Sequence, residues 1–111
     1  MELSIEQKNE IEKMEDILCK YFRIEKNDII SDIRAQKNSV ARYFLWYILH
    51  YELGISFLAI GRLYFRTPRT IKLGCSKMRL RIKTHRHYKS IYAELSEELS
   101  DMIAEYKKLF V

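Results

Sequence analysis

The stretch 56–83, SFLAIGRLYFRTPRTIKLGCSKMRLRIK, indicates how the rest of the chain folds. Ser56 is a good helix cap, and an apolar segment of residues 57–63 follows it. After a break, Thr67 and Pro68 begin a second, longer segment that extends to about residue 84. Threonine is a favoured cap and proline fits the first helical position, so this pair marks a helix start. The stretch therefore predicts two helices joined by a turn at 64–66, a helix-turn-helix.

Two stripes of side chains run along the second of these helices. One is apolar and recurs at steps of three and four, as a face that packs on a core does. It consists of Ile71, Cys75, Met78 and Ile82. The other is polar and mostly basic, and it consists of Arg69, Lys72, Ser76, Arg79 and Lys83. At about 100° per residue the stripes lie roughly a quarter-turn apart, so one faces the core and the other faces solvent. Gly74 weakens a helix interior by about 1 kcal/mol relative to alanine, which indicates close packing at that position.

Length and composition favour a single all-α domain spanning residues 1–111. The chain has 111 residues, 48% of them hydrophobic, which is typical of one globular domain. It contains only three glycines and one proline, and so few helix breakers favour long helices over strands and turns. We expect a compact domain of about six helices around a central helix-turn-helix.

Four further helices are predicted outside the central pair. Ser4 and Gln7 form a capping box that begins a helix ending near residue 22. A short helix at 29–33, with Asn27 or Asp28 as its cap, is followed by a polar loop at 34–39, and Ser39 can cap the next helix. That helix, 40–53, is apolar on almost every side, which is typical of a buried core helix. A last helix, 87–109, is apolar on one face and acidic on the other.

Acidic and basic residues are segregated along the chain. The formal net charge is +5, and the 41 residues between Glu52 and Glu94 contain ten lysines and arginines but no acid. A protein surface usually mixes charges of both signs. This segregation indicates a basic face that suits a polyanion.

Several classes of function find no support in the sequence. No apolar run approaches the roughly 18 residues of a membrane span, and the acidic N-terminal segment lacks the features of a secretory signal, so we expect a cytoplasmic protein. Cys19 and Cys75 lie 56 positions apart, without metal or redox spacing, and are expected to be buried, inert thiols. His85 and His87 have no further ligands spaced for a metal. No catalytic arrangement is identifiable, and we expect no enzyme activity, cofactor, metal or small-molecule substrate.

Short motifs in the order of these elements resemble a known DNA-binding family. Residues 17–34, ILCKYFRIEKNDIISDIR, resemble a pair of helices with a junction of the type Y-x-I-x-x-x-D-L, and residues 39–42 read S-V-A-R. Ile60-Gly61 lies in the first helix of the pair, and Thr70-Ile71 and Cys75 follow the turn. Over about residues 11–108 this pattern is similar to the C-terminal DNA-binding domain of the bacterial replication initiator DnaA, a Trp-repressor-like helix-turn-helix domain. The chain carries no phosphate-binding G-x-x-x-x-G-K-[ST] motif, so the likeness is to the DNA-reading domain alone.

The resemblance implies which residues contact DNA. Where the family has G-G-R-D-H-T-T, residues 64–70 read Y-F-R-T-P-R-T, so the reading residues are exchanged and the initiator's own site is not expected. Base contacts are expected at the helix start, where arginine can pair with guanine through two hydrogen bonds. They are Arg66, Thr67, Arg69 and Thr70. Phosphate contacts are expected from residues that fit the DNA backbone. They are Arg34, Lys37, Ser39, Arg42, Arg62, Lys72 and Lys77.

These observations predict a stand-alone duplex-DNA-binding protein with its second helix in the major groove. It would act as a regulator or replication accessory of a phage or mobile element. Other interpretations stay open at this point: a solvated basic face, a protein-interaction module that docks a partner through Tyr64-Phe65 or the acidic last helix, or a binder of structured RNA. A homodimer also stays open.

Overall fold

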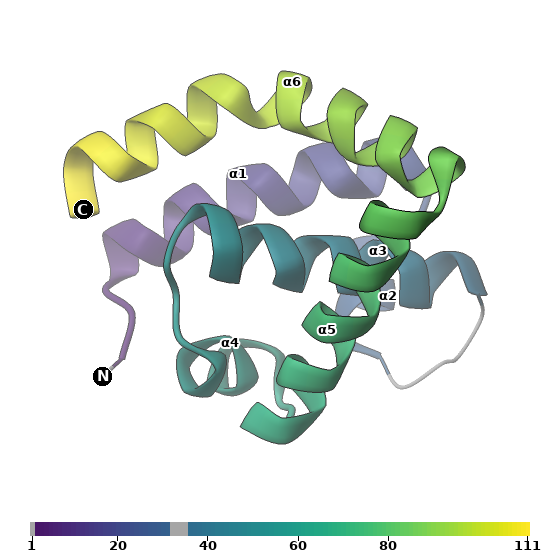
Figure 1. Ribbon diagram of the computed structural model, residues 1–111. Coiled ribbons are helices and arrows are strands. Elements are labelled where there is room, and N and C mark those ends of the chain that lie inside the picture. Colours follow the sequence, from purple (N-terminus) through teal and green to yellow (C-terminus); the bar gives the residue numbers. More distant parts are fainter. Residues whose placement is uncertain (1, 32–35) are drawn as a thin grey trace.

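The structure is a computed structural model that describes residues 2–31 and 36–111. These residues form six α-helices and no strand, which confirms the predicted all-α fold (Figure 1). The Cα radius of gyration is 13.0 Å, close to the value of about 13 Å for a compact chain of 100 residues. In chain order the helices are α1 (Ile5–Phe22), α2 (Lys26–Ile30), α3 (Gln36–Tyr47), which continues as a π-helical turn η1 (Ile48–Glu52), α4 (Phe57–Tyr64), α5 (Pro68–Thr84) and α6 (Arg86–Phe110).

Side-chain caps fix the starts of three helices where the sequence predicts them. At α1, Ser4 Oγ accepts from the Gln7 amide at 3.1 Å, and Gln7 Oε1 accepts from the Ser4 amide at 2.8 Å. At α4, Ser56 Oγ accepts from the Ala59 amide at 3.1 Å. At α5, Thr67 Oγ1 accepts from the Thr70 amide at 3.2 Å. Each cap satisfies a backbone N–H that a helix start leaves without a partner.

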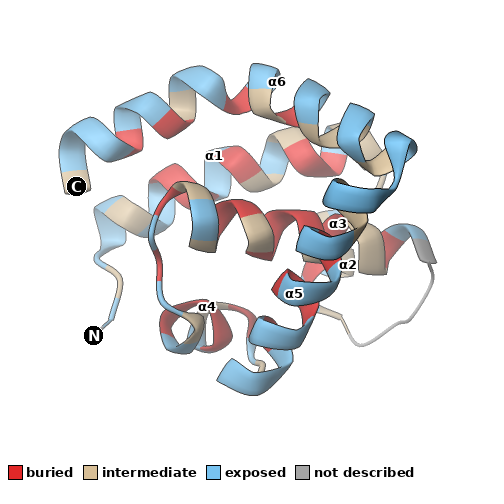
Figure 2. Ribbon diagram, in the orientation of Figure 1, coloured by how far each residue is buried: buried red, intermediate tan, exposed pale blue. Residues whose placement is uncertain are grey.

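Helix α3 is the central core element, as its all-round apolar sequence predicts. It contacts α1, α2 and α5, and α6 lies alongside α1 (Figure 1). Its buried face runs through α3 into η1 (Figure 2). The buried hydrophobic residues of this segment are Ala41, Phe44, Leu45, Trp46, Ile48 and Leu49. Helices α1, α2 and α5 therefore pack directly on α3, whereas α6 packs on α1 and α5 and α4 packs on α5 and η1.

Tyrosine–carboxylate hydrogen bonds link α6 to other parts of the fold. Tyr21 of α1 donates to Glu94 of α6, and Tyr92 of α6 donates to Glu52 of η1. Burial is the main cause that raises the pKa of Tyr21 to about 12, and the hydrogen bond that its hydroxyl donates to Glu94 also raises it. Both tyrosines therefore stay protonated donors at neutral pH.

The structure corrects two boundaries. Helix α3 begins at Gln36, so Ser39 lies inside it rather than capping it, and only residues 34–35 of the predicted loop lie outside the described part of the chain. Helix α2 begins at Lys26 rather than at residue 29, and the Asp28 carboxylate accepts from the Glu25 amide at 2.9 Å at its start. Both starts are polar turns, and hydrophobic periodicity does not register a turn that buries no apolar side chain.

Two glycines allow close approaches around α4 and α5. A Cβ at Gly61 would lie 2.4 Å from the carbonyl oxygen of Arg66, so the turn folds back against α4. A Cβ at Gly74 would lie 2.8 Å from Trp46 Cε3 and 2.9 Å from Tyr43 Cδ1, so α5 lies directly on the rings of α3. Close packing therefore explains the mid-helix glycine, as the sequence predicts.

The two thiols are buried and unpaired with one another. Burial raises the pKa of the Cys75 thiol to about 12, and burial also raises that of Cys19. A thiolate is the reactive form, so the raised pKa favours the less reactive thiol form at both positions. Within the described ranges, no helix has the length and apolar character needed to cross a membrane.

Candidate nucleic-acid interface

The start of α5 forms an exposed corner of the molecule. Thr67, Pro68, Arg69 and Thr70 are all exposed, and three of them belong to the predicted base-contacting set. The Thr67 and Thr70 hydroxyls lie 3.0 Å apart and Thr67 caps the helix, so both hydroxyls are engaged locally. Within the described chain, Arg69 makes no hydrogen bond or ion pair. Arg69 is therefore the side chain of this turn that is available to an incoming ligand.

Arg66, the fourth residue of that set, faces the scaffold. Its Nη1 donates to the Ile30 carbonyl at 3.2 Å, and its Nη2 donates to the Ser31 carbonyl at 2.9 Å. These carbonyls lie at the end of α2, where a helix leaves acceptors without partners. Arg66 therefore holds the turn before α5 against α2, and in this position it does not extend outward as a base-reading side chain.

Arg42 of α3, one of the predicted phosphate contacts, is buried in the structure. Its side chain is only 4% exposed, and its Nη1 donates to the carbonyls of Asp28 at 2.7 Å and Ser31 at 2.9 Å. Its Nη2 donates to Ser39 Oγ at 3.3 Å. A buried guanidinium is stable only when such acceptors surround it. Arg42 therefore links the end of α2 to α3.

A hollow between α3 and α5 gathers several residues of the predicted set. Its volume is about 300 Å³, and every charged residue that lines it is basic. Ser39 contributes from α3, while Thr70 and Lys77 contribute from α5. Arg42 and Arg66 form part of its wall. The remaining lining residues are Tyr43, Trp46, Leu73 and Gly74.

The other predicted phosphate contacts lie apart from this hollow. Lys72 lies with Arg69 on the side of α5 that faces Phe57 of α4. Lys37 lies beside the start of α6, where it lines a hollow with His87 and Tyr88. Arg62 lies by the N-terminal segment, with Leu3, Lys8 and Phe65. Arg34 falls outside the described residues.

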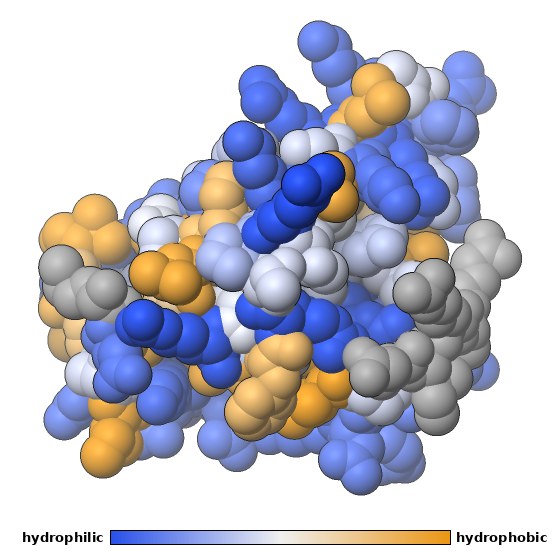
Figure 3. Space-filling model, turned by 90° about the horizontal axis from the view of Figure 1, so that it is seen from below, coloured by the Kyte–Doolittle hydropathy of each residue, from blue (hydrophilic) through white to orange (hydrophobic). Residues whose placement is uncertain are grey.

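Large hydrophobic side chains are exposed on and beside α5, and of these only Phe65 was predicted, as part of the apolar turn. Phe65 is 77% exposed and has φ 59, a left-handed conformation that is unusual for a bulky residue. Leu73 and Leu80 of α5 are 53% and 61% exposed. Figure 3 shows the molecule from below relative to the view of Figure 1, and on this face separate hydrophobic patches interrupt a largely hydrophilic surface. The spacing of Leu73 and Leu80, seven residues apart and outside the apolar seam, is the signal that reveals them.

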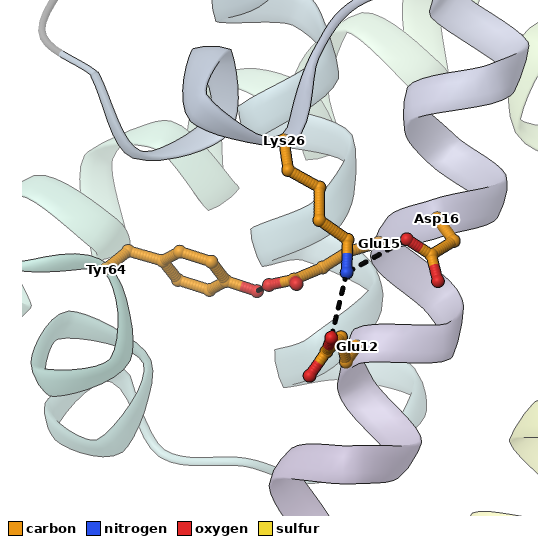
Figure 4. A network of polar contacts seen from close by, with 5 residues as sticks. All are labelled: Glu12, Glu15, Asp16, Lys26 and Tyr64. Atoms are coloured by element: carbon orange, nitrogen blue, oxygen red, sulfur yellow. Dashed lines mark hydrogen bonds and ion pairs between the residues drawn. The ribbon is translucent and has the colours of Figure 1, made fainter.

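Tyr64 differs from its neighbour Phe65. It is the last residue of α4 rather than part of an exposed turn, its ring is buried, and its hydroxyl donates to Glu15 of α1 (Figure 4). Burial is the main cause that raises the pKa of Glu15, and burial also raises the pKa of Tyr64 well above its usual value. The bond attaches the end of α4 to α1. Only Phe65 of the predicted apolar turn is accessible to a partner.

Every ion pair that joins two described residues involves α1. Lys26 pairs with Glu12 at 3.1 Å and with Asp16 at 2.9 Å (Figure 4), and Lys13 pairs with Glu10 at 2.7 Å. Described basic residues of α4, α5 and the start of α6 take part in no ion pair. Their charge is therefore not neutralised by neighbouring carboxylates. No group of His, Cys, Asp or Glu among the described residues is arranged to hold a metal ion.

No protein-family model matches the chain, and no curated protein matches it in sequence.

Proposed function

We propose that the chain binds duplex DNA, with α4 and α5 acting as a helix-turn-helix and the start of α5 entering the major groove. The observation that carries the proposal is the exposed first turn of α5. There Arg69 projects without an intramolecular partner from a helix whose basic side chains form no ion pair in the described structure. The resemblance to an initiator's DNA-reading domain supports a role as a regulator or replication accessory of a phage or mobile element.

The roles of individual residues follow from where they lie on α5. Arg69 is the base-reading residue, because its fork of donors matches the acceptors of guanine in the major groove. The N–H groups of the first turn, at the positive end of the helix, suit a backbone phosphate. Lys72 lies on the α4 side of this turn and Lys77 on the α3 side. The two lysines therefore lie on different sides of α5, as contacts to the two phosphate backbones beside a groove require.

Selection of bound oligonucleotides from a random duplex pool tests the proposal. The wild-type chain should enrich a defined sequence, Arg69→Ala should lose enrichment at one or two positions, and Lys72→Ala should weaken all duplexes alike. The slope of log affinity against log salt should decrease by about 1 for Lys72→Ala. Lys108→Ala, an exposed lysine near the end of α6, is the control with the same charge change. Failure to retain any duplex at low salt overturns the proposal, and preference for duplex RNA in competition reassigns the ligand.

A protein-interaction module is the second candidate, and the exposed ring of Phe65 favours it. A bulky side chain held in a left-handed conformation at a helix end costs about 1–2 kcal/mol, and burial against a partner would offset this cost. The discriminating experiment is a pull-down with and without nuclease. A partner that is retained after nuclease treatment and lost with Phe65→Ser supports this candidate, whereas nuclease-sensitive capture supports DNA binding.

A further inference from the structure

A second basic surface lies at the other end of α5, where α5 turns into α6. The segment from Arg79 to Lys89, both ends included, has five lysines and arginines, two histidines and no acid. Lys83, Arg86 and Lys89 are exposed, as are His85 and His87 between them. We call Lys83, Arg86 and Lys89, with the two histidines, the α5–α6 corner. The proposed DNA contact at the start of α5 does not include any of these residues.

Aromatic rings position part of this basic segment. The Arg81 guanidinium lies over the Tyr88 ring, 5.6 Å from its centroid, and the Arg79 guanidinium lies 5.5 Å from that of Tyr51. Lys37 of α3 lines a hollow with Tyr88 and His87, so a cation from a third helix is added to the same side. The sequence groups Lys37 with the predicted phosphate contacts of the helix-turn-helix, whereas in the structure Lys37 lies beside the α5–α6 corner.

The α5–α6 corner is too far from the start of α5 to be part of the same groove contact. Helix α5 has 17 residues and is therefore about 25 Å long, while the major groove is about 8.5 Å deep. Figure 1 shows the start of α5 and the start of α6 at opposite ends of this helix. Leu73 and Leu80, both exposed, interrupt the outward face between the two ends. The cations at the two ends of α5 therefore lie too far apart for one groove contact, and Lys72, Lys77 and Arg79 lie between them.

We propose that the α5–α6 corner binds a second segment of duplex DNA, so that one chain holds two duplexes together. This inference rests on the proposed function, because it takes the start of α5 as the first contact. A duplex is the partner that fits, since exposed lysine and arginine side chains without carboxylate partners bind phosphates and release their counterions. The contact is to the backbone, and it is independent of sequence.

Co-capture of two short duplexes tests the inference. A biotin-labelled and a fluorescent duplex of about 15 bp, roughly one and a half turns, are mixed with the full chain, and fluorescence on streptavidin is measured. The wild-type chain should bring both duplexes down. Arg86→Gln/Lys89→Gln should reduce co-capture by at least about tenfold and should lower the salt slope of the second binding event by about 2. Its affinity for the first duplex should stay within about twofold of wild type, since the first contact is unchanged.

Two further variants make the result specific. Lys107→Gln/Lys108→Gln removes the same charge from exposed positions at the far end of α6 and should co-capture like wild type. Arg86→Lys/Lys89→Arg keeps the charge and should also co-capture like wild type.

The possible failures are distinguishable. A wild-type chain that retains no duplex overturns the proposed function and this inference together. A chain that retains one duplex but never two overturns the inference alone. Unchanged co-capture by Arg86→Gln/Lys89→Gln overturns it, because bridging then comes from paired copies of the chain. Equal loss of the first duplex also overturns it, because the α5–α6 corner then belongs to a single footprint.

Discussion

Replacing Gly74 with alanine is expected to destabilise the fold, although alanine is the better helix former. In an exposed helix the change would stabilise by about 1 kcal/mol. At Gly74 the new Cβ would lie 2.8 Å from Trp46 Cε3 and 2.9 Å from Tyr43 Cδ1, and Trp46 is fully buried and cannot move aside. Overpacking of this kind costs about 1–3 kcal/mol, and the contact with two rings favours the upper half of that range. The expected net loss is therefore about 1–2 kcal/mol.

Urea unfolding followed by circular dichroism measures this difference. In thermal unfolding, a loss of 1 kcal/mol in the free energy of unfolding corresponds to a decrease in Tm of about 4–8 °C for a chain near this size. Ser76→Ala, two positions along on the exposed face of α5, is the matched control and should stabilise by a few tenths of a kcal/mol. If Gly74→Ala is instead more stable than wild type, α5 does not lie on the rings of α3 as described, and the hollow beside it is not formed as described.

Three further perturbations test other parts of the structure. Phe65→Gly should stabilise the chain by about 1 kcal/mol, because glycine adopts the left-handed conformation without strain and the exposed ring contributes little packing; lower stability in urea would contradict this. Arg42→Ala should lower the free energy of unfolding in urea by about 2–3 kcal/mol, because backbone carbonyls lose a charged donor. A lower salt slope of DNA binding without a loss of stability would instead support Arg42 as a phosphate contact. Glu15 has a raised pKa in the folded chain, so the folded state binds its proton more tightly than the unfolded state, and stability should fall as pH rises from about 4.5, the ordinary pKa, through the raised value. Glu15→Gln should remove this component of the pH dependence while keeping an acceptor for Tyr64, and an unchanged pH profile would refute the assignment.

Local signals in the sequence predict most of the fold. The caps at Ser4, Ser56 and Thr67 and the all-round apolar segment before Gly54 act within a few residues, so they can be recognised without knowing the tertiary structure. The apolar stripe of α5 and its mid-helix glycine, Gly74, are also signals that can be recognised locally. The first turns of α2 and α3 cannot be recognised in this way, because polar turns bury little apolar surface and leave no periodic pattern in the sequence.

The candidate site is less predictable because tertiary hydrogen bonds decide which arginines are accessible. In sequence, Arg42, Arg66 and Arg69 are three cations in a basic region. In the structure, the first two donate to carbonyls at the end of α2, and only Arg69 projects outward. Likewise, the place of Lys37 beside α6 depends on how α3 and α6 pack, which spacing along the chain does not encode.

Residue-level mapping of the bound state tests the central claim most directly. The claim is that the first turn of α5 enters the groove of a duplex. Amide nitrogen–proton NMR spectra recorded while a selected duplex is added should show the largest changes at Arg69, Thr70 and Lys72, with smaller changes around Lys77. Spectra that do not change, or whose changes are confined to α1 and the C-terminal half of α6, would contradict the claim.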